Sequence, residues 1–216
     1  MTRTAEGGKL AQTYRAQALA VRAKSMKEIM GLFPLLDLQN LDKTQARWLK
    51  ANIGAIERGR MSSAMLAARF SRRFAAVETG RRLGPAITPK LKLDKPKLAK
   101  SLLYVPTRVK IGMTKGETIE QAGRMALSIN VSKASTSVYA AGTDTIASVV
   151  SGTNPSMIPS QKPDNGWSRT AGPKSCEFCT MLAGRGAVYG GRLDESGVPH
   201  DFFVHETCGC TLVAAY

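Results

Sequence analysis

All four cysteines and both histidines of the chain lie between positions 176 and 210. They occur in SCEFC (175–179) and HETCGC (205–210), with His200 between these two segments. The pattern is a C-x2-C motif, a spacer of 25 residues and then H-x2-C-x-C. Cysteine thiolates and imidazole nitrogens are the ligands that a structural zinc ion prefers. The pattern therefore indicates metal binding.

The spacing lets these side chains converge on one ion. Cys176 and Cys179 are three residues apart and can meet at a turn, whereas Cys208 and Cys210 share a face of an extended segment. His205 can reach that face from the loop before Cys208. Five candidates exceed the four ligands of a tetrahedral site. We expect a structural zinc held by Cys176, Cys179, His205 and Cys208, with Cys210 as the substitute for His205 or Cys208.

Two other interpretations of the cysteines stay open. Four cysteines allow three disulfide pairings, and plain buried thiols would need no ligand at all. A catalytic zinc is disfavoured, because such sites keep an open position beside an acid or base, and Glu206 has no evident partner for that work. We interpret His200 as a loop histidine and expect no catalytic residue and no enzymatic activity.

The predicted ligands need a small domain around them. GWSRTAG (166–172) is typical of a short strand, and the end of the chain predicts a last strand. Residues 167–216 are thus predicted to form a cysteine- and histidine-rich α+β knot of about 50 residues. A unit of this size builds only a small core, so a metal or disulfides would have to stabilise it.

The rest of the chain is predicted to be helical. Apolar spacing predicts one helix over 8–33 and a second from Asp42 to Gly80, in which Gly54 and Gly59 favour a kink or a break. SLLYVPTRVKIG (101–112) is interpreted as short strands or a helix end with a turn at Pro106, and helices are expected over about 115–129 and 132–149. The fold class predicted for the whole chain is α+β, with a mostly helical, basic N-terminal region.

The domain boundaries follow from composition. Proline- and lysine-rich residues 83–97 and the turn-rich residues 151–166 are typical of linkers. We therefore expect a helical region at 1–82, a linker at 83–97, a helical middle region at 98–150, a second linker at 151–166 and the knot at 167–216.

Positive charge is concentrated in the first part of the chain. Residues 1–133 hold 26 Lys and Arg against 9 Asp and Glu, whereas residues 134–216 hold 5 against 7. Such a basic region predicts a polyanionic partner, although solvated helix faces are the alternative. The sequence has no apolar run of about 20 residues and no secretion signal at its start. We therefore expect a protein of the cytoplasm, with reduced thiols and no membrane partner.

The C-terminal segments resemble a known family. GWSRTAGPKSCEFCTMLAGRGAVY followed by HETCGCTLVAAY is similar to the minor head proteins of tailed bacteriophages, in particular the Mu-F-like group of actinobacterial phages. That group is marked by C-x2-C, then M-L-A-x-R-G-x-V-Y, and by a terminal H-x2-C-x-C. The matching residues are Cys176, Cys179, Met181, Leu182, Ala183, Arg185, Gly186, Val188, Tyr189, His205, Cys208 and Cys210.

The resemblance implies a virion structural protein for head morphogenesis. Its expected partners are the phage portal protein and the major capsid protein, with double-stranded DNA as a further candidate. Its expected location is the host cytoplasm during assembly and then the virion head near the portal vertex. Two alternatives are a zinc-binding, nucleic-acid-binding regulator and a capsid maturation protease, but the chain has no G-x-S-x-G nucleophile elbow.

Overall fold

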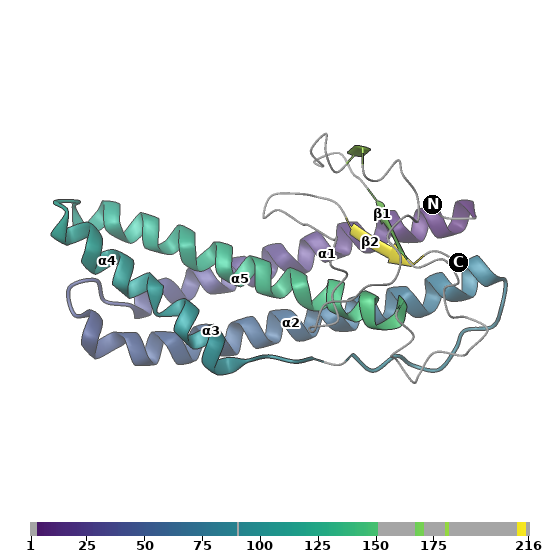
Figure 1. Ribbon diagram of the computed structural model, residues 1–216, viewed down its shortest axis with the longest axis horizontal. Helices are drawn as coiled ribbons and strands as arrows, with labels where there is room; N and C mark the ends of the chain where they lie inside the picture. Colours follow the sequence, from purple (N-terminus) through teal and green to yellow (C-terminus); the bar gives the residue numbers. More distant parts are fainter. Residues whose placement is uncertain (1–3, 90, 151–166, 171–179, 182–210, 215–216) are drawn as a thin grey trace. The chain divides into compact units, whose positions relative to one another are not determined.

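The structure, a computed structural model, describes residues 4–89, 91–150, 167–170, 180–181 and 211–214. Five α-helices, a short 3₁₀ helix and two strands lie in these ranges (Figure 1). In chain order they are α1 (Ala5–Leu32), η1 (Phe33–Leu35), α2 (Leu41–Thr79), α3 (Lys95–Leu102), α4 (Tyr104–Thr114), α5 (Ile119–Val150), β1 (Trp167–Thr170) and β2 (Thr211–Ala214).

The predicted α+β fold class is wrong. The described part of the chain is mostly helical, and its two strands have four residues each. They form one antiparallel pair with Trp167 opposite Ala214 and Thr170 opposite Thr211. Two strands of this length are too small to make a sheet domain. The rest of the predicted knot lies outside the described residues, and the domain boundaries drawn from composition stay predictions.

The helix predictions are confirmed for the first part of the chain and corrected after it. α1 and α2 occur as expected, and α2 continues through both Gly54 and Gly59. Residues 101–112, expected as short strands or as a helix end with a turn at Pro106, are the end of α3 and most of α4, so the strand alternative and the turn are wrong. Pro106 is the third residue of α4, where a helix needs no backbone N–H donor. The two helices expected after 115 are the single helix α5.

Side-chain caps define where the later helices begin. Asp94 precedes α3 and accepts a hydrogen bond from the Lys97 backbone N–H at 2.8 Å. At α5, the Thr118 hydroxyl accepts from the Gln121 backbone N–H at 3.2 Å, while the Gln121 side chain accepts from the Thr118 N–H at 2.9 Å. This reciprocal pair is a capping box, which satisfies two N–H groups that the helix itself leaves without acceptors.

The chain forms two compact units, and neither is a continuous stretch of sequence. Unit 1 comprises Met1–Leu19, Ser62–Leu91 and Ala140–Tyr216, and unit 2 comprises Ala20–Met61 and Lys92–Tyr139. Each of the helices α1, α2 and α5 therefore contributes residues to both units. None of the described helices is long and apolar enough to cross a lipid bilayer.

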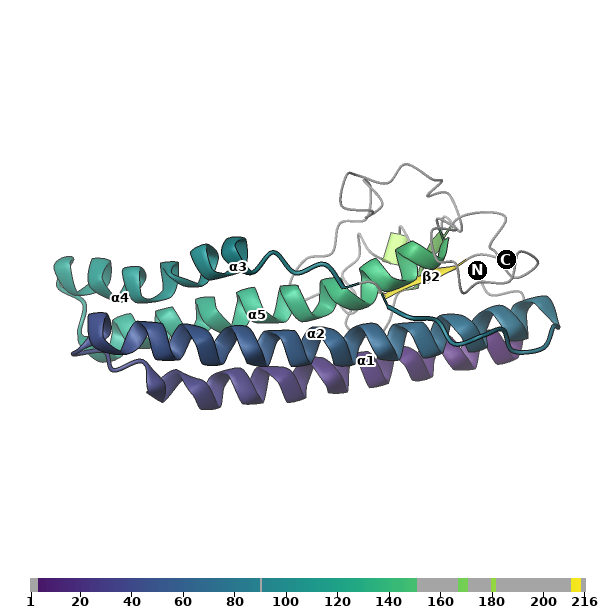
Figure 2. The same cartoon turned by 90° about the horizontal axis from the view of Figure 1, so that it is seen from below.

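Unit 2 is a bundle of four helical segments that lie side by side (Figure 1 and Figure 2). They are the second part of α1, the first part of α2, α3 together with α4, and the first part of α5. Trp48 and Ile56 of α2 are fully buried with Leu102, Val105 and Val109 of the third segment. Burying such side chains contributes about 1.5–3 kcal/mol each.

A polar contact crosses the apolar core of unit 2. The buried Asn130 side chain on α5 donates to the Asn52 side-chain oxygen on α2 at 3.0 Å. The Asn52 amide in turn donates to the Trp48 backbone oxygen at 3.0 Å. A buried amide without such partners would cost about 1–3 kcal/mol, so this contact fixes which turn of α5 faces which turn of α2.

Unit 1 is built on an aromatic stack surrounded by alanines. The Tyr14 and Phe70 rings have centroids 4.3 Å apart and planes 13° apart, and Phe74 packs 5.1 Å from Phe70. Burial raises the pKa of the Tyr14 hydroxyl well above its usual value. The Thr4 hydroxyl, which accepts from the Gly7 N–H, donates to Glu78 at 2.9 Å and so ties the start of α1 to α2.

Two glycines of α2 have different surroundings. A Cβ at Gly59 would lie 2.7 Å from both the Ser25 hydroxyl oxygen and a Val138 methyl group. Ser25 is buried and its hydroxyl donates to the Val21 backbone oxygen, so the oxygen cannot easily move away. A Cβ at Gly54 would meet only the end of the Arg58 side chain, at 3.5 Å.

Alanine substitutions at these glycines are expected to have opposite effects. Gly54→Ala should raise the free energy of unfolding by about 1 kcal/mol, because alanine favours a helix and the site has room. Gly59→Ala should lower it by about 1–2 kcal/mol, because overpacking outweighs the gain in helix propensity. Urea unfolding followed by circular dichroism measures both. Two changes of the same sign would contradict the tight contact at Gly59.

Candidate functional site

The predicted metal ligands are not placed by the structure. Cys176, Cys179, His205, Cys208 and Cys210 all lie outside the described residues, as does His200. Within the described ranges, no three His, Cys, Asp or Glu side chains are grouped as metal ligands. The zinc site therefore stays a prediction, and so do the disulfide and free-thiol alternatives.

The strand pair does constrain the chain near the predicted ligands. Because Thr170 lies opposite Thr211, the chain leaves β1 at the same end of the ladder at which it enters β2. In sequence, Cys176 follows β1 by six residues and Cys210 directly precedes β2. The pairing is therefore compatible with the convergence that the spacing predicts.

The charged side chains of unit 2 show which of its cations are paired. The unit holds 17 Lys and Arg but only 7 Asp and Glu. Five of the acids form ion pairs, which are Glu28–Arg58, Glu57–Lys95, Glu117–Arg108, Asp42–Lys110 and Glu120–Arg124. Asp37 accepts hydrogen bonds within its own turn, and Asp94 caps α3. All seven acids of the unit are thus already engaged.

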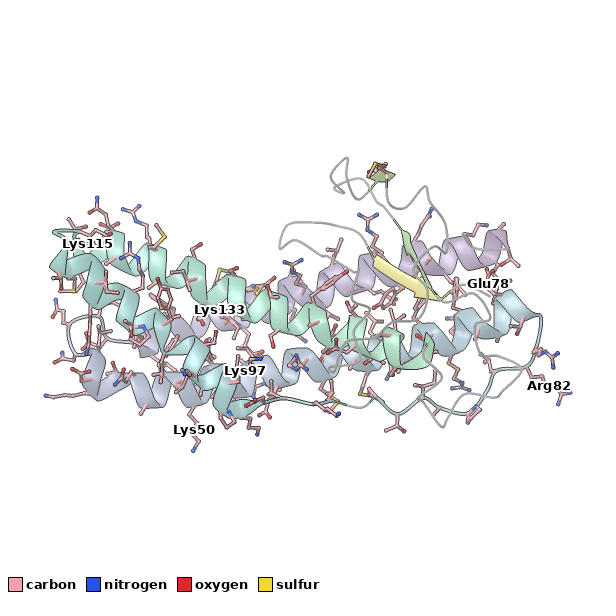
Figure 3. All side chains as sticks on the ribbon, viewed as in Figure 1. Lys50, Glu78, Arg82, Lys97, Lys115 and Lys133 are labelled. Atoms are coloured by element: carbon pink, nitrogen blue, oxygen red, sulfur yellow. The ribbon has the colours of Figure 1, made fainter. Side chains whose placement is uncertain are left out.

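Three of the remaining cations form a line along α2, which we call the basic line: Lys43, Arg47 and Lys50. All three are exposed, and they follow one another by four and three residues, so they lie on one helical face. None of them has an ion pair or side-chain hydrogen bond with the described residues. Figure 3 shows Lys50 extending from α2 away from the bundle.

A second exposed surface lies on the third segment of unit 2. Only Leu103, whose backbone is itself right-handed helical, separates α3 from α4. Leu103, Tyr104 and Ile111 form an apolar strip on the outer face and are 39%, 48% and 39% exposed. Lys133 of α5 donates to the Ser101 hydroxyl at 2.9 Å and has its Nζ 5.9 Å from the Tyr104 ring centroid. The strip therefore combines an aromatic ring with positive charge.

The same segment carries the most enclosed ion pair of unit 2. Arg108 of α4 makes two hydrogen bonds to Glu117, at 2.7 and 3.1 Å, across the turn that leads to α5. Gly116 has a φ of 83° in this turn, which glycine adopts readily. The side-chain hydrogen bond from Arg108 holds the pKa of the Glu117 carboxyl below its ordinary value of 4.5. The pair therefore fixes the α4–α5 turn.

Unit 1 has a small groove between α2 and the extended segment that follows it. The groove has a volume of about 200 Å³ and is lined by Met65, Ala68, Arg69, Arg72, Ala86, Ile87 and Pro89. Arg72 donates from Nε to the Gly84 backbone oxygen at 2.6 Å, so part of its guanidinium is structural. The lining contains no thiol, hydroxyl, imidazole or carboxyl group, so the groove suits binding of an apolar side chain better than catalysis.

Sequence reasoning missed the apolar strip because it did not recognise the helix beneath it. The signal was present in Leu98, Leu102, Val105 and Val109, which are spaced four, three and four residues apart. These residues face the core or pack against it. Once this face is assigned to the core, the opposite face must be exposed.

The lowered pKa of Glu117 predicts a pH-dependent contribution to stability. A carboxyl whose pKa is depressed by folding stabilises the fold above its unfolded pKa, and this contribution is lost as the pH falls through the folded pKa. Glu117→Gln should therefore be less stable than the natural protein at pH 7, with the difference shrinking as the pH falls below about 4.5.

Thermal unfolding between pH 7 and pH 3 measures this effect. Glu120→Gln is the matched control, since the Glu120–Arg124 pair is solvent-exposed and contributes little. A stability difference for Glu117→Gln that stays constant over this pH range would contradict the role of the pair.

The predicted zinc site has its own test. Cys176→Ser or Cys208→Ser should unfold the chain from about 167 onward while α1 to α5 stay formed, because metal binding and folding share one free energy in a small metal-bound domain. Metal content and thiol count of protein purified under reducing conditions, followed by limited proteolysis, measure the effect. One zinc per chain and loss of protease resistance in the variants are expected. Unchanged resistance would contradict the prediction.

Comparison with protein-family models matches residues 8–216 to the family described as VG15 protein. A search of the curated proteins found no match, and a search of the solved structures found none either. The family match extends over the helices as well as the cysteine- and histidine-bearing segments, and it agrees with the phage origin that the sequence resemblance implied. Because it covers nearly the whole chain, this chain belongs to the VG15 protein family, a family of phage gene products, and is a phage-encoded protein.

Proposed function

We propose that this phage protein is a minor head protein of the Mu-F-like kind, which associates with the portal protein and the major capsid protein during head assembly. The match to a phage protein family covers both the helices and the C-terminal segments. The C-x2-C and H-x2-C-x-C motifs add the resemblance to minor head proteins. The proposed location in the virion is the head near the portal vertex, and the proposed role of zinc is structural.

The observation that carries this proposal is the apolar strip on α3 and α4. Leu103, Tyr104 and Ile111 are exposed large hydrophobic residues on one face. Exposed Lys97 and Lys100, which form none of the ion pairs of unit 2, lie beside them in sequence on α3. Protein interfaces have an apolar, aromatic-rich centre and a polar rim, and a few central aromatic residues dominate the binding energy. The strip has this composition.

The charge of the rim indicates what kind of partner fits. Lysines around an apolar centre favour a protein face that carries carboxylates, because opposite charges speed the encounter and exclude partners of the same sign. A structural protein that docks in this way needs no catalytic group. The proposed function therefore assigns the strip to a virion protein partner and no turnover to the chain.

Loss of the strip should weaken assembly with the portal. A Tyr104→Ala/Ile111→Ala variant should bind purified portal protein about tenfold more weakly or worse, since a central interface residue contributes about 1.4 kcal/mol or more. Sedimentation of the protein with portal and with procapsids measures this binding. The control is Met30→Ala/Met125→Ala, which removes two residues of unit 2 that are 46% and 50% exposed but lie on α1 and α5.

Two results would overturn the proposal. The natural protein could fail to cosediment with either portal or procapsid, or the control variant could lose as much binding as the strip variant. The second result requires that both variants keep the helical circular dichroism of the natural protein.

A further inference from the structure

The basic line of α2 has no acidic counterpart in its own unit. Lys43, Arg47 and Lys50 are exposed and have no partner among the described residues, while every carboxylate of unit 2 is engaged elsewhere. The nearest acid in sequence, Asp42, pairs with Lys110 at 2.7 Å. The line therefore keeps its full positive charge for a ligand.

The dimensions of the line suit a polyanion with closely spaced charges. Lys50 follows Lys43 by seven positions, which on a helix is an axial distance of about 10 Å. Double-stranded DNA carries one negative charge per roughly 1.7 Å of its axis. Three long, rotatable side chains on one face can therefore each reach a phosphate group.

The surroundings of the line distinguish nucleic acid from other anionic partners. The first half of α2, from Leu41 to Arg60, has no exposed large hydrophobic residue. A protein interface would need an apolar centre, and a membrane surface would need apolar side chains to insert between lipids. Phosphate contacts need neither, because they are made by charge and hydrogen bonding alone. This face thus differs from the apolar strip on α3 and α4.

We propose that the basic line binds the phosphate backbone of double-stranded DNA without reading the bases. The inference deepens the proposed function and rests on it in one respect, since a head protein meets DNA when the genome is packaged. The contacts position the protein on the duplex and carry no sequence preference. The apolar strip is left for the virion protein partner.

The binding is tested with the whole protein and two duplex fragments of unrelated sequence, by fluorescence anisotropy over a range of salt concentrations. The natural protein should bind both duplexes equally, with an affinity that falls steeply with salt. Lys43→Gln/Arg47→Gln/Lys50→Gln should reduce the slope of log affinity against log salt by about 2–3 and weaken binding roughly a hundredfold at 0.1 M salt, because each phosphate contact contributes about 0.9 to the slope.

The matched control neutralises three other exposed lysines of unit 2. Lys24→Gln/Lys27→Gln/Lys115→Gln removes the same charge from α1 and from the α4–α5 turn, and Figure 3 shows Lys115 at that turn, away from Lys50. This variant should retain most of the slope and affinity. All six side chains are exposed, so circular dichroism and melting temperature should stay unchanged in both variants.

Several results would overturn the inference. An equal loss in both variants would mean that net charge alone attracts DNA. Tighter binding to polyglutamate than to the duplex would assign the line to an acidic protein, and a footprint on one sequence would indicate base reading. Absence of DNA binding would refute it while leaving cosedimentation with portal intact, so its failure and that of the proposed function are distinguishable.

Discussion

The close approach of the long helices at small residues is the constraint on which the rest of the structure depends. Aromatic residues make up only 6% of the chain, so bulky side chains cannot fill wide gaps between helices. In unit 2 the contact at Gly59 leaves no room for a Cβ beside Ser25 and Val138. In unit 1 a Cβ at Gly142 would lie 2.8 Å from the Ser63 hydroxyl. Interiors packed at this density transmit strain and tolerate added volume poorly. The positions of exposed side chains therefore follow from contacts on the buried faces.

Sequence patterns predicted the helices whose apolar spacing is long and regular, and failed where local signals conflicted with packing. α2 was predicted almost in full, and Gly59, which the sequence marks as a point where a kink or break could occur, instead lets the helices meet because it has no side chain. α5 was divided in two at the polar and β-branched residues near Asn130, which lower local helix propensity. The buried hydrogen bond between Asn130 and Asn52 compensates for this low helix propensity. The two residues are 78 positions apart in sequence, so no local pattern can reveal the partner. Proline at position 106 was given too much weight for a different, local reason, because a proline in the first turn of a helix removes no hydrogen bond.

For the candidate sites too, sequence patterns located some features and only the fold revealed others. Charge counting located the basic region, but ion pairs such as Asp42–Lys110 and Glu57–Lys95 join different helices, so only the fold separates paired from unpaired lysines. The apolar strip required a helical assignment of residues 101–112, for which the sequence left short strands or a helix end open. The cysteine and histidine ligands depend on spacing alone, and spacing can state which side chains are able to converge but not which of the five do.

The surplus of positive charge on unit 2 has a thermodynamic consequence for any anionic partner. Exposed ion pairs such as Glu120–Arg124 contribute little to stability, and like charges left on a compact body repel one another and oppose folding. That repulsion is relieved only by salt or by a bound polyanion, because the acids of unit 2 are engaged in ion pairs, a turn and a cap. A ligand that binds the folded state alone also stabilises it. Neutralisation of Lys43, Arg47 and Lys50 by a bound polyanion would therefore strengthen the helices that present them, which couples the stability of the bundle to occupation of its basic face.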